Sequence, residues 1–80
     1  MSDTLKRVID VTADLLKIDT SAIKEESRFV EDLGAESIQS IELVAAFEEE
    51  FDIEMDEDEA LGVKTVGDAA EFINKVIAGE

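Results

Sequence analysis

The sequence contains no His, Cys, Pro, Trp or Tyr. Without Cys or His it can form no disulfide, no Ser-His catalytic triad and no ordinary zinc or haem site. Any catalysis by the side chains of this protein would have to use its carboxylates, its hydroxyls, its five Lys or its two Arg. A chain of 80 residues buries only about 60% of its unfolded surface, which leaves little room for a deep cleft. We therefore expect one domain over residues 1–80 and no enzymatic activity.

Basic side chains are also scarce, because 7 Lys or Arg stand against 22 Asp or Glu and give a net charge of −15. This balance argues against nucleic-acid binding and against anionic membrane surfaces. The longest apolar run, Leu43–Phe47, is too short for membrane insertion, and the N-terminus lacks a signal-peptide pattern. Because 45% of the residues are hydrophobic, a folded core is still expected. We predict a monomer located in the cytoplasm, with basic proteins as its partners.

The negative charge is concentrated in the middle of the chain. Residues 29–63 contain thirteen acidic and no basic side chains, whereas residues 1–28 contain six acidic and five basic ones. An exposed helix that only needs solvation usually mixes both signs. The central segment is therefore a candidate surface for recognising partners.

Hydrophobic periodicity predicts four helices and no strands. The first spans about 3–17, with Ser2, Asp3 or Thr4 as its cap, and a long connection over 18–36 follows, anchored by spaced apolar residues. The second spans 37–51, with Ser37 as its N-cap. The predicted fold is all-α, a small four-helix bundle of three main helices and one short helix.

The last two helices are marked by capping residues. Asp56 caps a short turn that stops at Gly62. Thr65 and Asp68 have the spacing of a capping box, and Gly79 closes the final helix. The apolar anchors expected along the 18–36 connection are Ile18, Ile23, Phe29, Val30 and Leu33.

Three sequence blocks resemble the acyl carrier proteins. They are F-V-E-D-L-G-A-E-S-I over 29–38, I-E-L-V over 41–44 and E-E-E-F-D-I-E over 48–54. They occur at the spacing of that family, and the resemblance covers essentially the whole chain. It implies a carrier that presents acyl groups, as thioesters, to enzymes of fatty-acid, lipid or polyketide biosynthesis.

The resemblance implies that Ser37 carries 4′-phosphopantetheine, which supplies the thiol that the polypeptide lacks. A helix N-terminus suits a phosphodiester, although a Ser in this position is often only a cap. No effective base lies near Ser37 in the sequence, so a phosphopantetheinyl transferase must load the arm from coenzyme A. No metal site is expected on the carrier itself.

Two groups of residues are expected to serve the carrier. An acidic surface along the second helix should meet acyl-processing enzymes that have basic docking patches. Its residues are Glu31, Asp32, Glu36, Glu42, Glu48 and Glu49. The second group is a set of core positions that, in similar carriers, also line a pocket for the acyl chain. Its residues are Phe29, Val30, Val44, Phe47, Met55, Ala60, Val63, Ala69 and Ile73.

The sequence departs from the family pattern around the serine. The usual Asp-Ser-Leu is Glu36-Ser37-Ile38, and the acidic residue often found two positions after the serine is Gln39. The frequent Ile-Pro-Asp is Met55-Asp56-Glu57. These changes leave attachment plausible and suggest a carrier with a specialised set of partners.

Other functions fit the sequence less well. A calcium loop counted from Asp52 fails, because its sixth position is Glu57 and its twelfth is Val63. An acidic mimic of nucleic acid would not explain the L-G-A-x-S block. Carboxylates one turn apart, such as Glu48 and Asp52, could act as acid and base, but surface repulsion is the simpler interpretation. Within the carriers, a peptidyl or D-alanyl cargo remains an alternative, as does weak binding of divalent cations.

Overall fold

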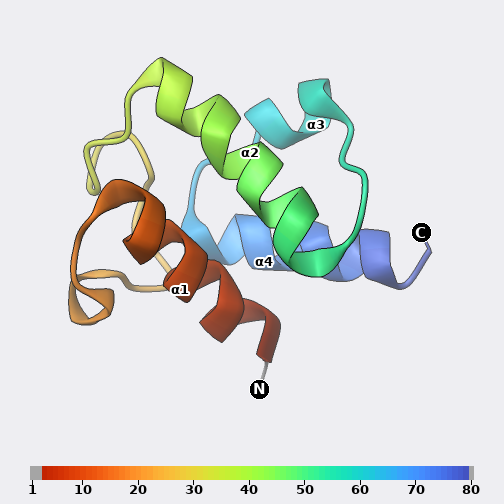
Figure 1. The fold of residues 1–80 in the computed structure, drawn as a ribbon, viewed down its shortest axis with the longest axis horizontal. Coiled ribbons are helices and arrows are strands. Elements are labelled where there is room, and N and C mark those ends of the chain that lie inside the picture. The colour runs from red at the N-terminus through yellow and green to blue at the C-terminus, as the bar shows by residue number, and fades with distance from the viewer. Residues whose placement is uncertain (1–2, 80) are drawn as a thin grey trace.

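The structure is a computed structural model that describes residues 3–79, without the side chains of Glu57 and Leu61. It confirms the predicted all-α fold, because the described residues form helices and no strand. The helices are α1 (Asp3–Leu16), α2 (Ser37–Phe51), α3 (Glu57–Leu61) and α4 (Val66–Ile77). Figure 1 shows α1, α2 and α4 as the three main helices, with the short α3 beside α2.

The helix α1 ends one residue earlier than predicted. Lys17 has a φ of 60°, a left-handed conformation that stops the helix after Leu16. Of the proposed caps, Ser2 lies outside the described residues. The helix packs against both α2 and α4, so it forms one wall of the bundle.

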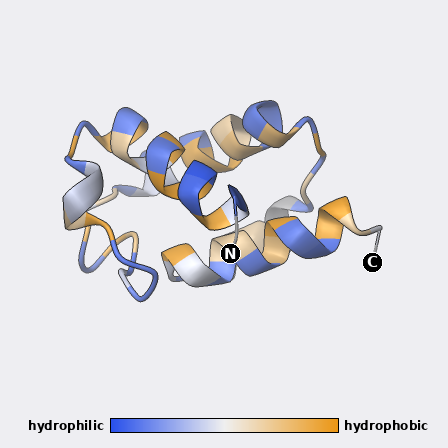
Figure 2. Ribbon diagram, turned by 90° about the horizontal axis from the view of Figure 1, so that it is seen from below, coloured by the Kyte–Doolittle hydropathy of each residue, from blue (hydrophilic) through white to orange (hydrophobic). Residues whose placement is uncertain are grey.

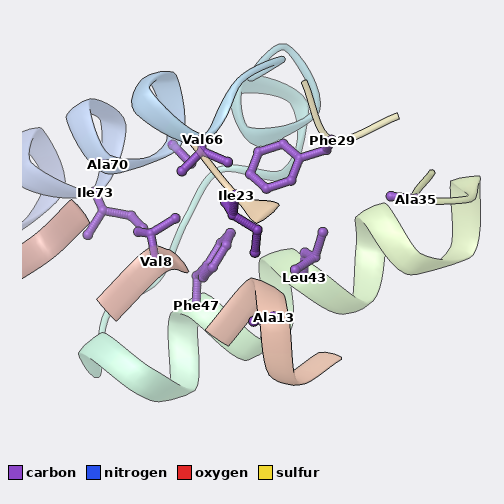
Figure 3. Packing of buried hydrophobic residues seen from close by; sticks show 11 residues of the cluster. Val8, Ala13, Ile23, Phe29, Ala35, Leu43, Phe47, Val66, Ala70 and Ile73 are labelled. Atoms are coloured by element: carbon purple, nitrogen blue, oxygen red, sulfur yellow. The ribbon is translucent and has the colours of Figure 1, made fainter. Parts of the chain in front are cut away.

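The core lies between the three main helices. Hydrophobic and hydrophilic residues occupy different sides of the helices, as expected when each helix buries one stripe (Figure 2). In Figure 3, Val8 of α1, Phe47 of α2 and Ile73 of α4 point into a shared interior. Val8 and Ile73 are fully buried. Mutual burial of these stripes is the main source of stability.

The connection between α1 and α2 is ordered by packing rather than by regular structure. It contains one turn of 3-10 helix, Thr20–Ala22, which the sequence did not predict. Ile23 and Phe29 are buried as expected, whereas Val30 is 58% exposed and does not anchor the connection. A small side chain that was not among the predicted anchors, Ala35, is 4% exposed and packs into the core.

The same connection is fastened to the start of α4. Val66 N–H donates to Ser27 O at 2.9 Å, and Gly67 N–H donates to Glu25 O at 2.7 Å. In the other direction, Phe29 N–H donates to Lys64 O at 3.1 Å. The first two bonds satisfy amides that the N-terminus of α4 would otherwise leave free. They also hold the segment that leads to Ser37 against the bundle.

The structure confirms the predicted caps and stops of the last two helices. Asp56 Oδ1 accepts from Asp58 N–H at 2.9 Å, and Thr65 Oγ1 accepts from Asp68 N–H at 3.0 Å. Gly79 follows the end of α4 with a φ of 83°. Gly62 ends α3 with a φ of −81°, so this stop does not depend on the left-handed freedom of glycine.

Candidate attachment and docking site

Ser37 is the first residue of α2 and is exposed, but it is not the N-cap that the sequence analysis predicted. The N-cap is Glu36, with extended backbone, and its N–H donates to Gln39 Oε1 at 2.9 Å. Within the described residues, the Ser37 hydroxyl makes no hydrogen bond. The helix start is thus stabilised by its neighbours, and the hydroxyl is left free for other chemistry.

Unpaired backbone N–H groups give the N-terminus of α2, where Ser37 lies, a partial positive charge. The first internal hydrogen bond of α2 runs from Ser40 N–H to Glu36 O at 2.9 Å. The N–H groups of Ser37 and Ile38 have no partner among residues 3–79. Unpaired amides and the macrodipole of a 15-residue helix favour an anionic group attached at this end.

A compact turn sets the direction in which the chain enters α2. Ala35 N–H donates to Phe29 O at 2.9 Å, and Gly34 N–H donates to Val30 O at 3.2 Å. Gly34 has a φ of 74°, which glycine adopts without the strain that a side chain would cause. Because Phe29 and Ala35 are both buried, this turn holds Ser37 at a fixed place on the surface.

The six predicted acidic residues have different surroundings. Glu36, Glu42 and Glu49 are exposed, and no ion pair involves them in the described part of the chain. On α2, Glu42 and Glu49 are seven residues apart and therefore share one face. These three carboxylates form the uncompensated part of the acidic surface.

The other three acidic residues have structural partners. Arg28 Nε lies 3.8 Å from Glu31 Oε1 and 3.4 Å from Asp32 Oδ2. The hydrogen bond that Asp32 accepts from the Arg28 backbone, at 2.9 Å, is the largest cause that lowers the pKa of Asp32 below its ordinary value. Glu48 Oε2 accepts from Met55 N–H at 2.8 Å and so ties α2 to the segment that precedes α3.

The helical recurrence of apolar residues over 37–51 would place Ile38 and Ile41 in the buried stripe of α2. Instead, Ile38 is 63% exposed and Ile41 is 51% exposed. With the exposed Ala45 they form an apolar strip beside Glu42 and Glu49. Such a surface combines the apolar contacts and the charge that protein partners recognise. An apolar residue next to the serine, at Ile38, was the signal that could have suggested it.

A cavity of about 280 Å³ lies between α2, α3 and the start of α4. Eight of the nine predicted pocket residues line it, and the ninth, Ile73, lies in the core beside Val8 (Figure 3). The rings of Phe29 and Phe47 meet at a centroid distance of 6.4 Å. Four further residues, which no pattern in the sequence indicates, also line the cavity, namely Glu31, Ser40, Leu43 and Lys64.

Two negative findings bear on the remaining alternatives. Among the side chains that the structure describes, which do not include that of Glu57, no group of three or more His, Cys, Asp or Glu is arranged to hold a metal ion. The helices that the structure describes are all too short or too polar to cross a membrane.

Comparison with known proteins decides the family. Residues 6–73 match a family described as "Phosphopantetheine attachment site". The chain is 47% identical over 78 residues to the acyl carrier protein of Caulobacter vibrioides (strain NA1000 / CB15N), covering 98% of this chain and all of the relative. It is 48% identical over 75 residues to the acyl carrier protein of Phenylobacterium zucineum (strain HLK1), covering 94% and 95% of the two chains.

The chain belongs to the acyl carrier proteins. It is therefore a carrier of acyl groups and not an enzyme, and its cofactor is 4′-phosphopantetheine. Membership also implies a transferase that adds the cofactor and acyl-processing enzymes that use it. The resemblance found in the three sequence blocks is confirmed.

The residues at the start of α2 fit such a cofactor. An acyl carrier protein needs an accessible hydroxyl, and Ser37 offers one that takes no part in capping. Free amides lie at the same end of the helix, where an attached phosphodiester would be stabilised.

Proposed function

We propose that Ser37 carries the 4′-phosphopantetheine arm, through which this acyl carrier protein holds its cargo. The observation that supports this most strongly is the free, exposed Ser37 hydroxyl at a helix start that Glu36 and Gln39 already cap. When bound, the group supplies a terminal thiol that holds acyl groups as thioesters. The chain's own part is to present the hydroxyl to the transferase and to stabilise the attached phosphate charge.

Loading in vitro tests the attachment. The purified chain is incubated with coenzyme A, Mg²⁺ and a broad-specificity phosphopantetheinyl transferase, and its intact mass is then measured. We expect the addition of one arm to the wild type and to Ser40→Ala, and none to Ser37→Ala. Ser40 is a matched control because it lies one turn further along the same helix. An unchanged mass of a folded wild type would overturn the proposal.

We further propose that the outer face of α2 is the docking surface for enzymes with basic patches. The uncompensated Glu42 and Glu49 steer the encounter, and Ile38 and Ile41 supply apolar contact once the partner has arrived. Association can then be fast while the complex stays short-lived, which suits a carrier that visits several enzymes.

A charge-matched pair of variants tests this docking surface. Glu42→Gln with Glu49→Gln removes two charges from the docking face, and Glu26→Gln with Glu71→Gln removes two exposed charges elsewhere. We expect the first pair to slow association with the transferase about tenfold at low salt and the second pair to change it less than twofold. Equal effects would show that only net charge matters.

Size-exclusion chromatography and cell fractionation test the predicted monomer and the predicted cytoplasmic location.

A further inference from the structure

A surface groove lies between α1 and α2. The two helices lie side by side and run in opposite directions (Figure 1). The groove measures about 430 Å³, and three residues of each helix line it, namely Val11, Asp14, Leu15, Ala46, Glu49 and Glu50. None of them lines the cavity beside α3. This α1–α2 groove is therefore a separate feature of the surface, to which neither the arm nor its cargo assigns a role.

The α1–α2 groove has an apolar floor and acidic edges. Val11, Leu15 and Ala46 are half-buried, so each still exposes some apolar surface to the groove. Asp14 on α1 and Glu49 on α2 are exposed, one on each helix. No ion pair of the described residues involves either carboxylate. Such a groove fits a side chain that has an apolar stem and a cationic end.

The protein already holds one side chain of this kind at the groove. Arg7 on α1 reaches across to α2, where its Nε lies 2.9 Å from Glu50 Oε2. Its Nη2 donates to Glu50 O at 2.7 Å, and the guanidinium lies 4.4 Å from the centre of the Phe51 ring. Arg7 thus neutralises Glu50 and leaves the charges of Asp14 and Glu49 uncompensated.

The groove is continuous with the outer face of α2. Glu49 lines the groove and shares a face of α2 with Glu42. It lies twelve residues after Ser37, or about 18 Å along the helix. A protein interface of ordinary size, about 800 Å² on each partner, is roughly 30 Å across. One partner can therefore cover both the start of α2 and the groove.

We propose that the α1–α2 groove receives an exposed arginine side chain of a partner protein. Its stem lies on the apolar floor, and its guanidinium contacts Asp14 and Glu49. Arginine fits better than lysine, because its planar guanidinium offers five N–H donors and can bond two carboxylates at once. The inference goes beyond the proposed docking surface, which lies on the outer face of α2, by adding α1 to the contact.

Titration with a free arginine derivative tests the groove itself. The ¹⁵N-labelled chain is titrated at low salt with N-acetyl-arginine methylamide, and the backbone amide shifts are followed by NMR. We expect the largest shifts along the groove and binding about fivefold weaker in Asp14→Asn with Glu49→Gln. Glu26→Gln with Glu71→Gln removes two exposed charges elsewhere and should change binding less than twofold.

A second pair of variants separates the shape of the groove from its charge. Ala46→Met fills the floor and keeps every carboxylate, so it should weaken binding as much as the loss of the two charges. Ala45→Met, the same change on the exposed outer face, should leave binding unchanged. Circular dichroism verifies that each variant is folded. The neutral citrulline derivative should not bind, and the lysine derivative should bind more weakly than the arginine derivative.

Three results would each overturn the inference. They are equal binding by the two charge-removed variants, undiminished binding by a folded Ala46→Met, and equal binding of the arginine and lysine derivatives. If Ala46→Met does not fold, the charge-removed variants and the lysine derivative still decide. The titration requires neither an arm on Ser37 nor a partner on the outer face of α2, so this inference and the proposed function can fail separately.

Discussion

At the start of α2, Glu36 caps the helix and Ser37 presents a free hydroxyl. A serine at a helix start is often itself the cap, which would engage its hydroxyl. Glu36 occupies the N-cap and binds Gln39 through its backbone N–H, and Ser37 is left exposed without a hydrogen bond in the described chain. The replacement of an acidic residue by Gln39, read from the sequence only as a lost charge, thus has a local structural role. The specialised set of partners suggested by the same replacement stays a prediction.

A second residue-scale feature is the buried hydroxyl of Thr12. Thr12 is fully buried on α1, and its Oγ1 has no hydrogen-bond partner in the part of the chain that the structure describes. An unsatisfied buried hydroxyl costs about 1–3 kcal/mol. We expect Thr12→Val to raise the free energy of unfolding by about 1 kcal/mol in urea titrations. The same change at Thr65, whose Oγ1 caps α4, should lower it by about 1 kcal/mol. If Thr12→Val is destabilising, the hydroxyl has a partner.

Asp32 gives a pH-dependent prediction at the same scale. The hydrogen bond from Arg28 N–H, with further support from its guanidinium, holds the pKa of Asp32 below the ordinary aspartate value of about 3.9. A lowered pKa stabilises the folded state above the unfolded value, and this contribution is lost as the pH falls through the folded value. Asp32→Asn should therefore be less stable than the wild type at pH 6, and the difference should shrink below about pH 4. Urea titrations between pH 2 and pH 6 measure it, with Asp14→Asn as the control for loss of one charge. A difference that does not change with pH would contradict the assignment.

At the scale of elements, the contact between the long connection and α4 depends on Gly67. A Cβ at this position would lie 2.8 Å from Glu25 Cγ and 3.1 Å from Glu25 O, so the connection would have to move. Gly67→Ala should lower the free energy of unfolding by about 1–2 kcal/mol, although alanine usually favours a helix.

Gly62→Ala is the matched control, because its Cβ would meet only Glu59 O at 3.4 Å. It should be neutral or stabilise by up to about 0.5 kcal/mol, since it restricts the unfolded chain. Equal effects of the two substitutions in thermal unfolding would show that the Glu25 contact does not constrain the fold.

The elements also show how far the sequence could predict the structure. The bounds of α2, the caps Asp56 and Thr65 and the stop at Gly79 follow from local chemistry and are confirmed. The two apolar faces of α2 could not be separated, because periodicity reports that apolar residues recur and not which stripe meets the core. Ile38 and Ile41 lie on the exposed face for that reason. The bonds from the connection to α4 join residues about forty positions apart, which no local pattern encodes.

In the whole molecule, negative charge is partly neutralised at the end of α2 far from Ser37 and uncompensated near Ser37. Its net value is −15, and in residues 3–79 the ion pairs involve only Lys6, Arg7 and Arg28. Arg7 Nε contacts Glu50 at 2.9 Å, and the guanidinium also lies 4.4 Å from the centre of the Phe51 ring. This arginine neutralises the end of α2 that is far from Ser37. Negative charge near Ser37 stays available to partners.

Repulsion within the acidic surface should make stability depend on salt. Raising NaCl from about 0.01 M to about 0.3 M shortens the Debye length from roughly 30 Å to under 10 Å. We expect the free energy of unfolding to rise by about 1 kcal/mol and the thermal midpoint by about 4 °C or more. A midpoint that stays constant or falls would show that the ion pairs outweigh the repulsion.

Mass analysis of the protein purified from its own cells shows whether the chain carries acyl groups through Ser37. We expect a population heavier than the polypeptide by the arm plus acyl groups, with the arm on the peptide that contains Ser37. Neutral hydroxylamine should release the acyl groups and leave the arm in place. An unmodified chain, or an arm on any other residue, would contradict this expectation.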